Sequence, residues 1–256
     1  MAGSIIYGPV PSWRLGRSLG IDLLSPKAKT CNFNCVYCQL GETANPATQR
    51  GEFVSLTQLT EELEGVKGIT ADYVTFSGIG EPTLASNLGQ AIEVAKSILS
   101  IPVAVLTNSS LMSREDVRKD LAKADVIVAK VDAHSQELFS QINRPIAGFL
   151  LSEILEGIKI FKKAFKGKLC LQIMFIEANK IFAKEIAQVL CRLSPDEVQL
   201  NTPLRPCAVR PLLPSQMASI RGAFDNFGNV ATVYEAPRPQ VMPLNLQATL
   251  RRRPKL

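Results

Sequence analysis

The sequence predicts an α/β protein whose parallel strands curl into a partial (β/α) barrel of about six main strands. Short β-rich runs alternate with helical patterns along most of the chain. Strands of about 4 to 8 residues between helices of about 10 to 15 are typical of βαβ units in a parallel sheet. Glycine and polar residues collect where the expected strands end, which is where a barrel keeps its active site. No GxGxxG loop follows the first expected strand, so a dinucleotide-binding open sheet is disfavoured.

The expected elements follow one another in a regular order. Apolar and β-branched runs predict strands at residues 18–24, 73–76, 103–106, 126–131, 169–176, 197–200 and 230–234. Apolar residues at helical spacing predict helices at residues 55–66, 84–99, 114–122, 136–142, 149–165, 181–193 and 215–227. Ser55 or Thr57 is a candidate N-cap for the first of these helices.

The two ends of the chain lack this alternation. Residues 7–17 are rich in proline and glycine, so we expect an ordered but irregular lead-in. Prolines between residues 236 and 243 predict an extended linker, and a helix could begin at 244–250. We therefore interpret residues 1–235 as one barrel domain with its lead-in, and residues 236–256 as a Pro-rich linker and basic tail.

Composition excludes several classes of protein. A hydrophobic content of 46% and a charged content of 20% are those of a globular protein rather than a disordered one. No apolar run approaches the roughly 20 residues of a membrane span, and the N-terminus lacks the order of a signal peptide, so we expect a cytoplasmic protein with no membrane partner. Six cysteines, some of them clustered, fit metal ligation in a reducing compartment better than disulfides.

The net charge of +6 permits an anionic partner such as nucleic acid. Part of the excess lies in the tail, at Arg251, Arg252, Arg253 and Lys255. Another part is a group of lysines at residues 159–168, on and just after a helical pattern. For these lysines a solvated helix face is the simpler interpretation.

The strongest motif is CxxxCxxC, formed by Cys31, Cys35 and Cys38. Three thiolates can hold three irons of a 4Fe–4S cluster and leave the fourth iron open for chemistry, whereas electron-transfer clusters take four cysteines. A structural zinc site needs four ligands at paired spacings, and no second pair accompanies this motif. A zinc-bearing nucleic-acid-binding protein without catalysis is the alternative from another functional class.

Candidate binding residues follow three of the expected strands. Gly78 and Gly80 precede Glu81 and would let the backbone approach a ligand closely, although a strand-to-helix turn alone would also explain them. The next strand ends in Thr107, Asn108 and Ser109, which could bind a ligand or cap the following helix. The strand after that ends in Lys130 and Asp132. A lysine in an apolar strand either extends outward to solvent or serves the site, and Asp132 could be its partner.

Four further residues are candidates for substrate contacts at the barrel mouth. Asn201 and Arg205 leave the last main strand, and the planar fork of an arginine suits phosphate or carboxylate. Arg144 could supply another cation there. Cys207 could react with a substrate radical, bind a second cluster, or serve only as a small residue.

These motifs together resemble one branch of the radical SAM superfamily, related to the tRNA wyosine-synthesis enzymes. The likeness spans about residues 5 to 206. It is carried by CxxxCxxC with Tyr37 before the last cysteine and QLG (39–41) after it, and by the runs GPVPSWRLGRSLGID (8–22), SGIGEPT (77–83), INRP (142–145) and NTPLRP (201–206). Wyosine synthases have a second cluster on cysteines ahead of this motif, but no cysteine precedes Cys31 here.

The resemblance implies a partial (β/α)6 TIM-type barrel and an oxygen-sensitive 4Fe–4S cluster on Cys31, Cys35 and Cys38, in an anaerobic or microaerobic cell. It implies S-adenosyl-L-methionine bound near Tyr37, Gly78, Gly80, Glu81, Thr107, Asn108, Ser109, Lys130 and Asp132. A reductant such as flavodoxin or ferredoxin would drive its reductive cleavage to a 5'-deoxyadenosyl radical. The candidate substrate is tRNA; activation of a protein by a glycyl radical and modification of a small metabolite are the alternatives.

Overall fold

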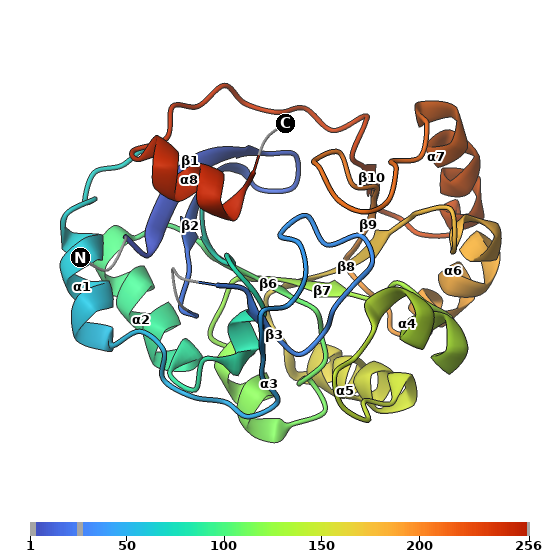
Figure 1. Ribbon diagram of the computed structural model, residues 1–256, viewed down its shortest axis with the longest axis horizontal. Coiled ribbons are helices and arrows are strands. Elements are labelled where there is room, and N and C mark those ends of the chain that lie inside the picture. The colour runs from blue at the N-terminus through green and yellow to red at the C-terminus, as the bar shows by residue number, and fades with distance from the viewer. Residues whose placement is uncertain (1–3, 25–27, 255–256) are drawn as a thin grey trace.

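A curled sheet of eight strands forms the centre of the structure, in the order β1-β2-β5-β6-β7-β8-β9-β10. The structure is a computed structural model that describes residues 4–24 and 28–254. The β1–β2 pair is antiparallel and the remaining pairs are parallel. Within the described ranges β1 and β10 are the two edge strands of this sheet, and helices lie around the outside of the sheet (Figure 1). The predicted partial barrel is therefore confirmed.

The elements match the predicted alternation closely. The strands are β1 (Ile6–Ser12), β2 (Gly16–Ile21), β3 (Thr30–Cys31), β4 (Asn45–Pro46), β5 (Tyr73–Phe76), β6 (Val103–Thr107), β7 (Val126–Lys130), β8 (Lys168–Met174), β9 (Glu197–Asn201) and β10 (Val230–Thr232). The helices are α1 (Leu56–Glu64), α2 (Leu88–Leu99), α3 (Glu115–Leu121), α4 (Gln136–Asn143), α5 (Leu151–Ala164), α6 (Ala183–Cys191), α7 (Pro214–Arg221) and α8 (Leu246–Arg252). Short 3-10 turns lie at Pro82–Leu84, Lys180–Phe182 and Gly222–Phe224. Ser55 is the N-cap of α1, because its side chain accepts a hydrogen bond from the Gln58 N–H.

The expected irregular lead-in at residues 7–17 is wrong, because this segment forms the hairpin of β1 and β2. Pro9 and Pro11 lie in β1, the edge strand. A proline has no N–H to donate, and an edge strand tolerates that loss because no neighbouring strand of the sheet lies along its outer side. The register also shifts between Tyr7 and Val10, so prolines that indicate a break in the sequence are accommodated within a strand.

The two faces of the curled sheet differ in polarity. The outer face and the helices share the large apolar core. The inner face has a smaller apolar cluster of Leu15, Ala104, Val126, Val128 and Cys170. It also has buried polar pairs, with Ser18 Oγ 2.7 Å from Thr75 Oγ1 and Gln172 Nε2 3.2 Å from Gln199 Oε1. The barrel interior can therefore accommodate polar groups.

The C-terminal segment crosses the open side of the barrel, from β10 to α8 beside β1 (Figure 1). The Leu244 N–H donates to the Gly8 carbonyl at 2.6 Å, and the Gly8 N–H donates to Thr249 Oγ1 at 3.0 Å. Residues expected to be a linker and tail thus span the gap between the two edge strands, and the helix expected at 244–250 is α8. Lys255 lies outside the described residues, and the division at residue 235 stays a prediction.

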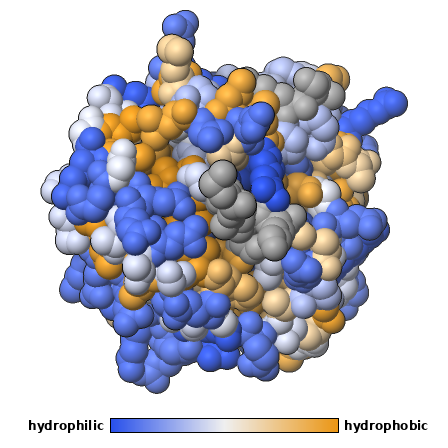
Figure 2. Space-filling model, turned by 60° about the vertical axis from the view of Figure 1, so that its left-hand side comes forward, coloured by the Kyte–Doolittle hydropathy of each residue, from blue (hydrophilic) through white to orange (hydrophobic). Residues whose placement is uncertain are grey.

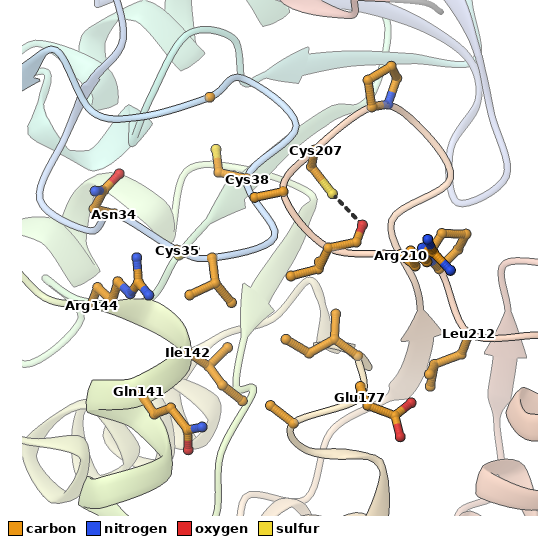
Figure 3. Close-up of a pocket in the computed structure, with 18 of the residues that line it drawn as sticks. Asn34, Cys35, Cys38, Gln141, Ile142, Arg144, Glu177, Cys207, Arg210 and Leu212 are labelled. Atoms are coloured by element: carbon orange, nitrogen blue, oxygen red, sulfur yellow. Dashed lines mark hydrogen bonds between the residues drawn. The ribbon is translucent and has the colours of Figure 1, made fainter.

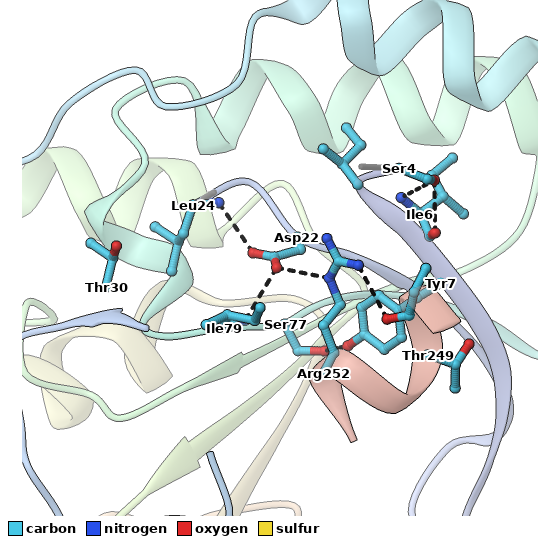
Figure 4. A network of polar contacts seen from close by, with 12 residues as sticks. Ser4, Ile6, Tyr7, Asp22, Leu24, Thr30, Ser77, Ile79, Thr249 and Arg252 are labelled. Carbon is cyan, nitrogen blue, oxygen red and sulfur yellow. Dashed lines mark hydrogen bonds and ion pairs between the residues drawn. The ribbon is translucent and has the colours of Figure 1, made fainter. Parts of the chain in front are cut away.

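A buried ion pair fixes α8 in this position. Arg252 Nε lies 2.8 Å from Asp22 Oδ2, and both side chains are 1% exposed. Asp22 also accepts hydrogen bonds from the N–H groups of Leu24 and Ile79, so one carboxylate joins the end of β2, the turn after β5 and the C-terminal helix (Figure 4).

The outer surface is mixed. Figure 2 shows one face of the molecule, where hydrophilic side chains cover much of the area and apolar residues are visible in patches between them. Apolar atoms make up roughly half of most protein surfaces, so scattered patches need no special explanation. None of the helices in the described ranges has the length and apolar character needed to cross a membrane.

Replacing Arg252 with methionine should destabilise the fold, because the Asp22 carboxylate would remain buried without its cation. Removing one partner of a buried ion pair costs about 3–5 kcal/mol. We expect a loss of that order in the free energy of unfolding, measured by urea denaturation. Arg251, which is exposed on the same helix, provides the control: Arg251→Met should change stability by no more than about 0.5 kcal/mol. Equal stability of the two variants would contradict the proposed role of the pair.

Candidate functional site

The cysteine motif lies on a loop at residues 31–38, the cysteine loop, which meets the turn after β5. The Thr30 N–H donates to the Ile79 carbonyl at 3.0 Å, and the Glu81 N–H donates to the Thr30 carbonyl at 3.1 Å. Gly80 has a φ of 140°, and a Cβ there would overlap the Thr30 carbonyl oxygen. Glycine is therefore required at residue 80 for this close approach of two backbone segments.

The end of α4 holds the other side of the loop. The Asn34 N–H donates to the Arg144 carbonyl at 3.0 Å, and the Val36 N–H donates to the Ile142 carbonyl at 2.9 Å. Phe33 packs edge-on against Phe139 and Phe149, with ring centroids 5.3 and 5.7 Å away. The INRP run at residues 142–145 therefore helps to fix the position of the cysteine loop.

Amide groups lie beside two of the three cysteine sulfurs. Asn108 Nδ2 is 3.7 Å from Cys31 Sγ, and Asn143 Nδ2 is 3.6 Å from Cys35 Sγ. Burial, with the nearby Glu81 carboxylate, raises the pKa of Cys31 to about 12. Burial, with Asp132, raises the pKa of Cys35 to about 11. A bound metal deprotonates a coordinating thiol, so these thiols suit a metal centre better than free thiolate chemistry.

The donor set fits a cubane cluster. In a cubane each thiolate binds its own iron, so the sulfurs need not converge on one point. A single zinc ion would draw all its sulfur ligands to about 2.3 Å. Within residues 4–24 and 28–254, no group of three His, Cys, Asp or Glu side chains is arranged to hold one ion.

Glu81 joins the ends of β5 and β6. Its buried carboxylate accepts hydrogen bonds from Thr83, from Thr107 Oγ1 at 2.7 Å and from the Asn108 N–H at 2.6 Å. Burial raises its pKa. The Glu81 and Thr107 side chains are therefore engaged with each other. In the described part of the chain, the Gly78 and Gly80 carbonyls accept no hydrogen bond, and buried Ser109 Oγ has no partner.

Asp132 joins the ends of β7 and β8 to the cysteine loop. Its buried carboxylate accepts hydrogen bonds from the Tyr37 hydroxyl, from Asn143 Nδ2 at 2.8 Å and from the Met174 N–H at 2.7 Å. Lys130 Nζ lies 3.2 Å from Asp132 Oδ1, an ion pair without hydrogen-bond geometry, and 4.9 Å from the Tyr37 ring centroid. The predicted pairing of Lys130 with Asp132 is confirmed.

Asn143 is a residue that the sequence interpretation missed. It bonds Tyr37 and Asp132 as well as the Cys35 sulfur. It belongs to the INRP run, which was the available signal.

Two cavities border the cysteine loop. A groove of about 1170 Å³ has Cys35, Cys38, Arg144 and Cys207 among its lining residues (Figure 3). Cys207 lies on the loop that faces Cys38 across this groove (Figure 3), and its Sγ donates to the Val209 carbonyl at 3.1 Å.

The second cavity, of about 290 Å³, lies inside the barrel. Its lining includes Tyr37, Cys38, Lys130, Asn201 and Arg205. The predicted substrate residues are therefore divided between the two cavities, and Cys38 borders both.

Comparison with known proteins gives consistent results. The model of the Radical SAM superfamily matches residues 26–189. A UPF0026 protein of Synechocystis sp. is 43% identical over 202 residues, which cover 78% of this chain and 76% of that relative. A UPF0026 protein of Methanocaldococcus jannaschii is 39% identical over 224 residues, covering 85% of this chain and 69% of that relative.

The fold also resembles that of solved proteins. The structure of native anSMEcpe with bound AdoMet aligns with a TM-score of 0.63 at 19% identity, covering 85% of this chain and 64% of that one. The curled sheet, the three-cysteine loop over its strand ends and the matched family together identify this chain as a member of the radical SAM superfamily.

Proposed function

We propose that this radical SAM enzyme holds a 4Fe–4S cluster on Cys31, Cys35 and Cys38 and cleaves S-adenosylmethionine reductively to modify a substrate. The observation that carries the proposal is the cysteine loop, which bears three thiols. Its backbone is hydrogen-bonded to the turn after β5 on one side and to the end of α4 on the other. When bound, the cluster and S-adenosylmethionine would supply an electron and a 5'-deoxyadenosyl radical that abstracts hydrogen.

The surrounding residues have distinct proposed roles. The Gly78 and Gly80 carbonyls, which accept no hydrogen bond within the described residues, would accept hydrogen bonds from the amino group of S-adenosylmethionine. Lys130 would attract its carboxylate. Asn108 and Asn143 would donate hydrogen bonds to cluster sulfurs, an interaction that tunes reduction potential.

Asp132 would orient Tyr37 and Asn143 rather than contact the cofactor itself, because its oxygens already accept several hydrogen bonds. The reductant, such as flavodoxin or ferredoxin, and the cytoplasmic location stay predictions from the sequence.

Anaerobic reconstitution with iron and sulfide tests the cluster. We expect a brown protein whose electron paramagnetic resonance signal, after reduction, changes when S-adenosylmethionine is added, and which releases 5'-deoxyadenosine detectable by mass spectrometry. Cys38→Ala should abolish both signals. The exposed Cys191 on α6 is the control, and Cys191→Ala should behave as the unaltered protein. A colourless protein that retains zinc would contradict the proposal.

Replacing Asn143 with leucine tests the hydrogen bond to Cys35. Loss of an N–H donor to a cluster sulfur should make the reduction potential more negative and slow 5'-deoxyadenosine formation by about 10- to 100-fold. A redox titration followed by electron paramagnetic resonance measures the first effect. Asn87 is a matched control, since it is also buried, donates to the Val54 carbonyl and leaves its Oδ1 unpaired. If Asn87→Leu shifts the potential as much as Asn143→Leu, the proposed role is wrong.

The tRNA substrate predicted from the sequence can be tested by gel shift with total tRNA over a salt series. Phosphate contacts by several basic residues would make binding fall steeply as salt rises. A lack of binding at low salt would exclude tRNA as the substrate. Binding that is unaffected by salt would mean that its phosphates are not what the protein recognises.

A further inference from the structure

Several cations line the second cavity, the one inside the barrel, which is the inner cavity. Arg14, Arg205, Arg238 and Arg253 all line it, and no aspartate or glutamate is among its lining residues. Arg14 belongs to the turn between β1 and β2, Arg205 to the loop after β9, and Arg238 and Arg253 to the C-terminal segment. These four arginines, the arginine cluster, therefore converge from three regions of the chain on one space of about 290 Å³.

The arginine cluster has no compensating charge within the described residues. Lys130, the other cation of the cavity, is paired with Asp132, but none of the four arginines forms an ion pair there. Arg14 Nε and Arg205 Nη1 are buried without hydrogen-bond partners. The Arg205 Nε instead donates to the neutral Gln39 Oε1 at 2.7 Å.

Partial burial and mutual repulsion make this arrangement costly for the protein alone, since Arg14, Arg205 and Arg253 are half-buried while Arg238 is exposed. Burial and repulsion lower the pKa of Arg14 to about 9 and that of Arg205 to about 10, with Arg253 contributing to both. Some basic residues elsewhere have acidic partners: Lys162 Nζ is 2.6 Å from Asp196 Oδ1, and Lys168 Nζ is 2.6 Å from Glu197 Oε2. Buried polar atoms of charged side chains are normally hydrogen-bonded, so the unpaired Arg14 Nε and Arg205 Nη1 at one cavity indicate a place for an anion.

We propose that the arginine cluster binds a multiply charged oxyanion group, phosphate or carboxylate, of a small-molecule substrate. This inference rests on the proposed function and assigns its substrate class. A guanidinium donates two parallel hydrogen bonds to either oxyanion. The cavity also reaches Cys38 and Tyr37 on the cysteine loop, so a molecule anchored at the arginines would extend towards the proposed cluster.

The shape of the site favours a small molecule over a nucleic acid. About 290 Å³ is at the lower end of the range for small-ligand pockets. The C-terminal segment crosses the open side of the barrel (Figure 1) and supplies Arg238 and Arg253 to the cavity. Arg14 Nε is buried, so the phosphates of a polynucleotide on the outer surface would not reach it.

Calorimetric titration of the reconstituted full chain tests the proposal. The probes are inorganic phosphate and pyrophosphate in one arm and malonate and citrate in the other, each with and without saturating S-adenosylmethionine. We expect saturable binding of at least one probe in the presence of S-adenosylmethionine, and the arm that binds more tightly distinguishes phosphate from carboxylate. Arg14→Gln and Arg205→Gln should each weaken it about ten-fold or more, whereas Arg251→Gln, on the exposed face of α8, should not.

Thermal unfolding separates a binding role from a structural one. Without added anion, Arg14→Gln and Arg205→Gln should unfold at the same or a higher temperature than the unaltered protein, because repulsion is relieved. A lower unfolding temperature in both, with probe binding unchanged, would assign these arginines to the fold and overturn the proposal.

Three other results would also overturn it: no saturable binding of any probe, binding abolished by S-adenosylmethionine, or arginine-dependent binding of tRNA without binding of the small probes. Release of 5'-deoxyadenosine by the unaltered protein is measured in parallel. A protein that binds the probes but never forms 5'-deoxyadenosine would refute the proposed function while leaving the anion site intact.

Discussion

The buried carboxylate of Asp132 is the constraint on which the arrangement of the site depends. It bonds Tyr37 of the cysteine loop, Asn143 at the end of α4 and the backbone of Met174 at the end of β8, and it pairs with Lys130 of β7. A buried carboxylate is costly unless its lone pairs are satisfied, so these partners are held in one arrangement. Through Asn143 the same carboxylate orients a donor towards the Cys35 sulfur.

A second buried carboxylate, that of Asp22, has a comparable role at the open side of the barrel. Asp22 at the end of β2 pairs with Arg252 of α8, and its other hydrogen bonds go to the backbone of Leu24 and of Ile79 in the turn that meets the cysteine loop. One ion pair therefore ties the C-terminal helix to the segment that supports the cysteines. Because Arg253 follows directly in sequence, the same attachment brings a cation into the inner cavity.

Local patterns in the sequence were enough to predict the partial barrel and which polar residues follow its strands. The strand at 73–76 and the pairing of Lys130 with Asp132 follow from alternation and from the cost of an isolated buried cation. The β1–β2 hairpin did not follow, since whether a proline breaks a strand depends on whether that strand lies at a sheet edge. The arginine cluster could not be predicted either. Arg14, Arg205 and Arg253 meet only because the sheet curls and the C-terminal segment returns to β1, and no local spacing encodes that.

The cations of the inner cavity border the cysteine loop. Arg205 Nε donates to Gln39, the residue after Cys38, at 2.7 Å, and Lys130 Nζ lies 4.9 Å from the Tyr37 ring centroid. An oxyanion held by Arg205 would therefore lie close to Cys38, which lines the same cavity. Opposite charges attract more strongly where bulk water is excluded, so an anionic group would be drawn to this end of the cavity. Binding energy gained at the arginines would then position the rest of the substrate at the proposed cluster.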